Sequence, residues 1–186
     1  DRLYAVVGRT LLCLDRRDGA VRWQRQAEYD RFSLAATDGA VFAFDSAEPP
    51  LMGADDRPGR EGILLSLDPA AGDAKWQKPI PYPTVPEQKP GAVRPWLQPI
   101  VPALIYNDRH DVLLAVFNRV HYFASRGATG AELWRTEVAP ARGARWLHIT
   151  ALPTVTEEYV IGPHKDYGNN GVVLDVQTGD VVDRGA

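Results

Sequence analysis

Short apolar runs separated by turns rich in Gly, Asp and Pro recur along the whole chain. No segment has the sustained 3.6-residue spacing of a long helix, whereas short alternating or continuous apolar runs are typical of strands. Asp38-Gly39, between two such runs, is a strong hairpin signal. The pattern predicts an all-β fold of about fifteen strands, at residues 3–7, 10–14, 20–25, 32–36, 40–44, 63–67, 73–78, 100–106, 112–116, 119–123, 131–137, 149–154, 159–162, 171–175 and 180–183.

One sequence repeat organises these strands. Residues 11–23, LLCLDRRDGAVRW, are matched by residues 64–76, LLSLDPAAGDAKW. In both copies an apolar run is followed by Asp, then by Gly four residues later, and by Trp four residues after that. The motif residues of these two copies are Asp15, Gly19, Trp23, Asp68, Gly72 and Trp76.

Two further copies are less regular. The third keeps Gly130 and Trp134 but has Arg126 at the Asp position, and the fourth keeps Asp175 and Gly179 but has Asp183 at the Trp position. The glycines at 19, 72, 130 and 179 are 53, 58 and 49 residues apart. A period near fifty residues built from short strands is the length of one four-stranded propeller blade.

The repeat therefore predicts one β-propeller domain over residues 1–186, built from antiparallel four-stranded blades. About four blades are expected, with the first strand of the first blade missing. Their approximate bounds are residues 1–30, 31–79, 100–138 and 147–186, with insertions at 46–62 and 79–99.

Each motif residue has a structural explanation. Asp accepts hydrogen bonds from backbone amides of its own turn, and Gly adopts the positive φ that closes the turn. Counting by two from Gly19 puts Val21 and Trp23 on the same face of the next strand. A large indole at this recurring position is expected to pack between adjacent blades.

Composition excludes several classes of protein. The 186 residues are 45% hydrophobic and 24% charged, which indicates a globular chain. A net charge of −3 gives no basic face for nucleic acid, and no apolar run approaches the ~20 residues of a transmembrane segment. Cys13 is the single cysteine, which excludes an internal disulfide and a thiolate zinc cage.

The two regular copies resemble the tryptophan-docking repeat of pyrroloquinoline-quinone-like β-propellers, the quinoprotein alcohol dehydrogenase-like family. That family includes the dehydrogenases and a propeller lipoprotein of the outer-membrane β-barrel assembly machinery. The resemblance implies a propeller of seven or eight blades, of which this chain holds about four; a closed four-bladed propeller is the alternative. It also implies a periplasmic or cell-surface location in a bacterium.

The resemblance also implies which cofactor, metal ligands and cysteines a dehydrogenase of this family would have. Such enzymes hold pyrroloquinoline quinone (PQQ) beside Ca²⁺, with carboxylate and amide ligands and an aspartate base, and many have a pair of adjacent cysteines. Cys13 has no neighbouring cysteine, and the best acidic pair, Asp55-Asp56, is better explained as a solvated loop with Arg57 and Arg60 as counter-charges. No catalytic residue and no metal ligand is therefore assigned, and PQQ and calcium belong only to the alternative interpretation.

The loops offer weaker candidates for binding. His164, Asp166 and Tyr167 lie in one loop, where they could bind a small anion or transfer protons, although an ordinary rim loop is the favoured explanation. Trp96, in the second insertion beside arginine, suits an interface or a loop anchor. The remaining aromatic and histidine residues considered are Trp146, His110, His121 and His148.

These observations predict a non-catalytic binding or scaffold module that recognises a protein or a small molecule at a propeller rim. The alternative is a fragment of a PQQ- and calcium-dependent dehydrogenase whose active-site residues lie outside this segment.

Overall fold

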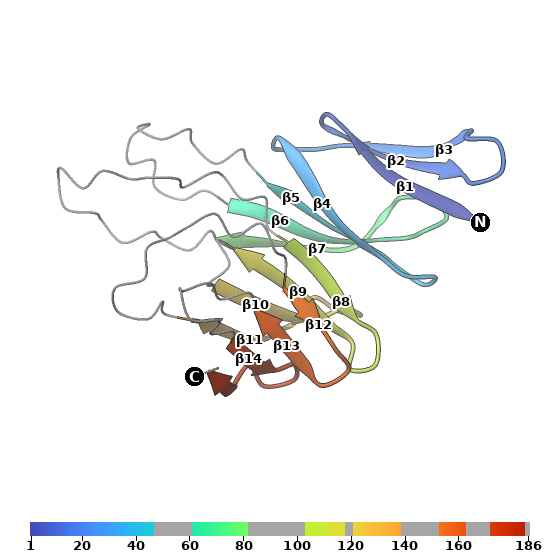
Figure 1. Ribbon diagram of the computed structural model, residues 1–186. Coiled ribbons are helices and arrows are strands. Elements are labelled where there is room, and N and C mark those ends of the chain that lie inside the picture. Colours follow the sequence, from blue (N-terminus) through green and yellow to red (C-terminus); the bar gives the residue numbers. More distant parts are fainter. Residues whose placement is uncertain (47–60, 82–102, 118–120, 139–152, 163–171, 185–186) are drawn as a thin grey trace, which may run out of the picture.

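The computed structural model describes residues 1–46, 61–81, 103–117, 121–138, 153–162 and 172–184 (Figure 1). These residues form fifteen β-strands and no helix. The strands make four antiparallel sheets in which spatial neighbours are also neighbours in the sequence. The predicted all-β architecture of propeller-type sheets is confirmed.

The bounds of the strands follow the repeat. The first sheet contains β1 (Arg2–Val7), β2 (Thr10–Asp15) and β3 (Val21–Gln26). The second contains β4 (Arg31–Ala36), β5 (Val41–Ser46), β6 (Glu61–Leu67) and β7 (Ala74–Pro81). The third contains β8 (Ala103–Asn107), β9 (Val112–Phe117), β10 (His121–Arg126) and β11 (Glu132–Glu137). The fourth contains β12 (Thr154–Val155), β13 (Tyr159–Gly162), β14 (Val172–Asp175) and β15 (Val181–Arg184).

The first sheet has three strands and lacks a counterpart of β4, as the sequence predicts. Elsewhere the structure differs from the predicted bounds. Strand β7 runs to Pro81, so that the first residues of the predicted 79–99 insertion belong to the second sheet. β7 is the edge strand of its sheet and has no described strand on its other side. Its prolines, which lack a backbone N–H, therefore break no second row of hydrogen bonds.

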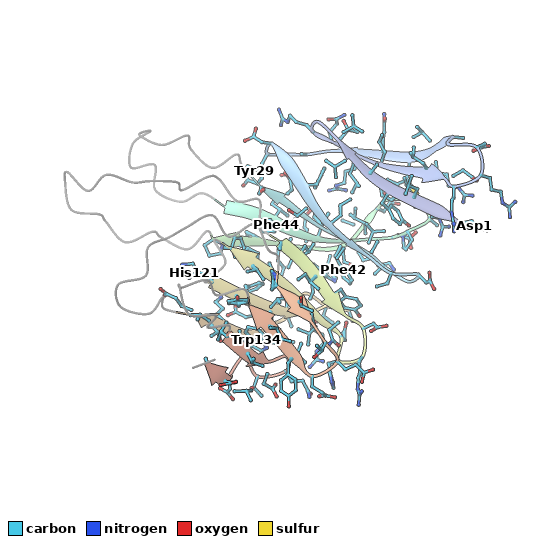
Figure 2. The ribbon with its side chains drawn as sticks, viewed as in Figure 1. Asp1, Tyr29, Phe42, Phe44, His121 and Trp134 are labelled. Carbon is cyan, nitrogen blue, oxygen red and sulfur yellow. The ribbon has the colours of Figure 1, made fainter. Side chains whose placement is uncertain are left out.

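Three hydrophobic cores lie between consecutive sheets. The first and second sheets enclose Leu11 and Leu67, the second and third enclose Phe44 and Leu113, and the third and fourth enclose Tyr122. Strands β5 and β9 are buried along their whole length because their sheets are covered on both faces, which explains their continuous apolar sequences. Figure 2 shows Phe42 and Phe44 between the second and third sheets.

No core joins the first sheet to the fourth within the described residues, and Figure 1 shows these two sheets at opposite ends of the molecule. The four sheets form an open arc. A closed four-bladed propeller, the alternative expectation, is not the arrangement observed.

A β-bulge recurs where each sheet turns into its last strand. Trp23 lies opposite Cys13 and Val21 lies opposite Leu14, which leaves Arg22 as the extra residue. Adjacent residues of β2 point to opposite faces, so Val21 and Trp23 also lie on opposite faces. Val21 is 57% exposed whereas Trp23 is 8% exposed, and the prediction that they share a face is therefore wrong.

Candidate interaction surfaces

The repeat tryptophans each contact the turn of the following sheet. The indole Nε1 of Trp23 donates a hydrogen bond to the carbonyl of Pro69 (3.1 Å). Trp76 donates in the same way to Gly127 (2.9 Å). Trp134 (Figure 2) donates to Val176 (3.0 Å). Every acceptor is the residue directly after the Asp position of the repeat, so one junction geometry is used three times.

The repeat glycines provide the surface on which these indoles lie. A Cβ at Gly72 would lie 2.7 Å from Cδ2 of Trp23, and one at Gly179 would lie 2.5 Å from Cδ2 of Trp134. At Gly130 the nearest atom, Cε3 of Trp76, would be 2.8 Å away. All three glycines also have positive φ. A side chain is therefore excluded at these positions by contact and by backbone conformation together.

The repeat aspartates stabilise their own turns. Asp15 Oδ1 accepts the amide of Arg17 (2.8 Å), and Asp68 Oδ1 accepts the amides of Ala70 and Ala71. These backbone amides are the main cause of the lowered pKa of both carboxyl groups. Asp175 Oδ1 makes the same bond to the amide of Gln177 (2.8 Å).

The third turn has a substitute for its missing aspartate. Where the repeat has Arg126, the carboxylate comes from Asp111 at the neighbouring turn, whose Oδ1 accepts the amide of Ala128 at 3.0 Å. Asp111 also accepts the phenol hydrogen of Tyr106 (2.9 Å), and its carbonyl accepts the amide of Gly127 (3.0 Å). No sequence pattern indicates this role of Asp111, because the bond joins turns of two different hairpins.

A polar contact joins the third and fourth sheets. The side-chain amide of Asn107 donates to the carbonyls of Thr156 (2.8 Å) and Glu157 (3.0 Å). His110 Nε2 lies 3.4 Å from a carboxylate oxygen of Glu158. His110 therefore belongs to a contact between two turns, and His121 Nδ1 lies 3.9 Å from Glu137 within the third sheet.

The other candidates from the sequence lie outside the described residues. They are Trp96, His164, Asp166 and Tyr167, together with Asp55, Asp56, Trp146 and His148. Their roles therefore remain sequence predictions.

The acidic groups of the repeat turns and the Cys13 thiol are engaged in turns or buried in a core. No group of three or more His, Cys, Asp or Glu residues within them could hold a metal ion. The turn carboxylates of Asp15, Asp68, Asp111 and Asp175 are directed at backbone amides, and Cys13 is buried between the first two sheets. In the same part of the chain, no helix is long and apolar enough to span a membrane.

The first and fourth sheets each have one exposed apolar face. The corresponding faces of the other sheets are buried. Leu3 pairs with the residue before the repeat Asp, as do Val41, Leu113 and Val160 in the following sheets. Those three are each 0% exposed, because each packs on the preceding sheet, whereas Leu3 is 54% exposed.

The opposite face of the fourth sheet is open in the same way. Ile161 corresponds to Phe42 and Leu114 of the preceding sheets, which are each 1% exposed, but Ile161 is 42% exposed. The other exposed large apolar residues are Val7 and Val21 of the first sheet, and Tyr159 and Val182 of the fourth. All the exposed large apolar residues among the described ones thus lie on the first and fourth sheets.

Comparison with known proteins agrees with this architecture. A family model described as outer membrane protein assembly factor BamB matches residues 1–184. None of the curated protein sequences matches the chain.

Among solved structures, BamB from Moraxella catarrhalis is 22% identical with a TM-score of 0.58, and the match covers 97% of this chain and 48% of that one. Quinohemoprotein alcohol dehydrogenase ADHIIG from Pseudomonas putida HK5 is 14% identical with a TM-score of 0.61, covering 100% and 33%. Quinohemoprotein alcohol dehydrogenase from Comamonas testosteroni is 15% identical with a TM-score of 0.56, covering 99% and 33%. The chain thus spans about half or a third of the length of these similar structures.

Proposed function

The chain belongs to the β-propeller family described as outer membrane protein assembly factor BamB, and on this premise we propose that it is a non-catalytic binding or scaffold module of the bacterial envelope. The observation that carries the proposal is the family match, which extends over residues 1–184. The expected location is the periplasm or the cell surface, and the expected partner is a protein or a small molecule bound at a propeller rim.

The use of polar groups in the described sheets supports this proposal. The carboxylates of the repeat turns are engaged by backbone amides, and the amide of Asn107 ties two sheets together. These interactions build a rigid frame, and catalysis would need polar groups that converge on a substrate. Loops carried by such a frame are where binding residues are usually found.

The alternative is a fragment of a PQQ- and calcium-dependent dehydrogenase. It rests on the likeness to the two alcohol dehydrogenases, and at 14% and 15% identity that likeness concerns the fold. Under this alternative the catalytic residues would be supplied by sequence beyond this segment.

Two measurements test the proposal. The first adds PQQ and CaCl₂ to the protein purified from its bacterial source and follows dye-linked oxidation of a primary alcohol together with the melting temperature. We expect no turnover and no shift in melting temperature; quinone-dependent turnover would replace the proposal with the alternative.

The second measurement places a photo-crosslinking amino acid on the protein in living cells. The sites are Asp38 and Asp108, two exposed residues in turns of different sheets, with exposed Gln24 in the middle of β3 as the control. A binding module should give a discrete protein adduct from a rim site and none from Gln24. Adducts of equal yield at all three sites would indicate unspecific contact and argue against a rim-binding function.

A further inference from the structure

The same tetrapeptide, Asp-Gly-Ala-Val, occurs in two turns of the structure. It occupies residues 18–21, between β2 and β3, and residues 38–41, between β4 and β5. Both aspartates and both glycines are exposed. An Asp-Gly pair in an exposed turn can cyclise, because glycine has no side chain that hinders attack by its amide nitrogen on the neighbouring carboxyl group. Since the two sequences are identical, the surrounding structure decides which pair reacts faster.

The turn at residues 18–21 holds both reacting groups in hydrogen bonds. The amide of Gly19 donates to the carbonyl of Asp15 (2.9 Å). The carboxylate of Asp18 accepts the amide of Ala20 at Oδ1 (2.9 Å). Attack of the Gly19 nitrogen on the Asp18 carboxyl group therefore requires two hydrogen bonds of ordinary length to break.

The turn at residues 38–41 restrains the same two groups much less. None of the hydrogen bonds and ion pairs among the described residues involves the side chain of Asp38. The amide of Gly39 donates only to Oγ1 of Thr37, at 3.3 Å, which is longer than an ordinary N–H···O bond. That hydroxyl also accepts the amide of Ala40 (3.2 Å) and is shared between the two donors. The carboxyl group and the nitrogen of this pair are thus free to approach each other.

The reaction between these groups is a rearrangement of the chain. The amide nitrogen of Gly39 attacks Cγ of Asp38, and one carboxyl oxygen leaves as water with the amide proton and a solvent proton. Water then opens the cyclic imide. Addition at Cγ restores aspartate, whereas addition at the former backbone carbonyl frees an α-carboxylate and leaves the chain linked through Cγ. The second product is isoaspartate, and its formation needs no oxidant and no cofactor.

We propose that Asp38 is a site of spontaneous isoaspartate formation in the folded protein, and that Asp18 is protected by its turn. The modification ages the protein at the connection between β4 and β5. It is independent of the proposed binding function, because it involves only groups of this turn and solvent water.

The position of the turn gives the modification a structural consequence. Isoaspartate adds one methylene group to the backbone of a turn that is closed by the bond from the Thr37 amide to the Ala40 carbonyl (2.9 Å). Val41 and Phe42 follow directly and are 0% and 1% exposed. The ring of Phe42 lies 4.7 Å from that of Tyr106, between the second and third sheets. A lengthened turn displaces these buried side chains, so the modified protein should unfold at a lower temperature.

Peptide mass spectrometry of the purified protein, incubated folded at neutral pH, tests the proposal. Electron-transfer dissociation identifies isoaspartate because its extra backbone bond gives diagnostic fragments. We expect isoaspartate to form about 10- to 100-fold faster at Asp38 than at Asp18, the ratio that two additional hydrogen bonds give.

Two controls separate the effect of the fold from that of the sequence. In urea both tetrapeptides are unfolded, and the two rates should become equal. In the Gly39→Ala variant the new methyl group hinders the attacking nitrogen, and isoaspartate at Asp38 should fall to background while the rate at Asp18 stays the same. This variant should fold normally, because a Cβ at Gly39 would meet nothing within 4 Å and Gly39 has no positive φ.

The proposal is overturned if folded protein forms isoaspartate at Asp18 as fast as at Asp38, or at Asp38 no faster than the Gly39→Ala variant does. It is also overturned if the excess at Asp38 persists in urea, since the sequence and not the fold would then set the ratio. The melting temperature should fall with incubation time in the unmodified sequence and stay constant in Gly39→Ala. Equal melting temperatures would refute the predicted effect on the core.

Discussion

Replacing Gly72 and Gly19 separately by alanine tests whether the tryptophan junction, and not only the turn conformation, holds the sheets together. The two glycines have almost the same backbone conformation, with φ of 78° and 75°. They differ in surroundings: a Cβ at Gly72 would lie 2.7 Å from Cδ2 and 2.8 Å from Cε3 of Trp23, whereas one at Gly19 would meet nothing within 4 Å.

The expected magnitudes follow from this difference. An L-residue in the left-handed region costs about 1–2 kcal/mol, so Gly19→Ala should lower the free energy of unfolding by that amount. Gly72→Ala has the same backbone cost and also overpacks a junction where Trp23 is 8% exposed and bonded to Pro69. Overpacking adds about 1–3 kcal/mol, which makes the expected total about 2–5 kcal/mol.

Urea unfolding followed by far-UV circular dichroism measures both changes. The slope of the free energy against urea should be the same for all variants, since a changed slope would indicate a different unfolding reaction.

A double-mutant cycle identifies the contact. With Trp23→Leu in place, the cost of Gly72→Ala should fall to that of Gly19→Ala, because the ring atoms that crowd the new methyl group are gone. The reasoning is refuted if the two alanine substitutions differ by less than about 0.5 kcal/mol, the usual error of additivity, or if Trp23→Leu leaves the difference unchanged.

Three other predictions concern buried groups. Burial raises the pKa of the Cys13 thiol, which is 0% exposed, so iodoacetamide should modify it at least about 100-fold more slowly in the native protein than in denaturant. Burial also raises the pKa of Tyr122 to about 12. An unfolded tyrosine titrates near 10, so this stabilising contribution is complete below pH 10 and is lost as the pH rises from about 10 to 12, and Tyr122→Phe should reduce the loss of stability measured by urea unfolding. Trp134→Phe removes the bond to the Val176 carbonyl and should cost about 1–3 kcal/mol in the same assay, whereas equal stability would show that this bond contributes nothing.

The sequence predicted the sheets well because the repeat combines two independent signals. Apolar runs locate the strands, and the Asp and Gly positions locate the turns, so the missing strand of the first sheet could also be inferred. The face on which each tryptophan lies was harder to predict. A bulge at Arg22 shifts the register by one residue and moves Val21 to the other face, and simple counting by two does not include that shift.

The open end faces could not be predicted from sequence. Leu3 and Ile161 have the apolar character of the buried residues that they correspond to, and only the absence of a packed neighbour within the described residues distinguishes them. A sequence records which face is apolar, but whether another sheet covers that face depends on the whole assembly.

The two irregular repeats each lack one motif residue, and the structure shows that only one of the two missing residues is replaced. In the third, Asp111 supplies the carboxylate that Arg126 cannot, and it does so from a turn fifteen residues earlier with a φ of 54°. The junction with Trp76 is therefore kept although the motif has lost a residue. In the fourth, no described residue replaces the indole that Asp183 lacks, and the face beside it is exposed. A lost aspartate can be replaced from a neighbouring turn because a single carboxylate suffices. A lost indole takes away a large apolar group, and a single polar residue from another turn does not replace it. The irregularity at Asp183 therefore has no replacement among the described residues, unlike the one at Arg126.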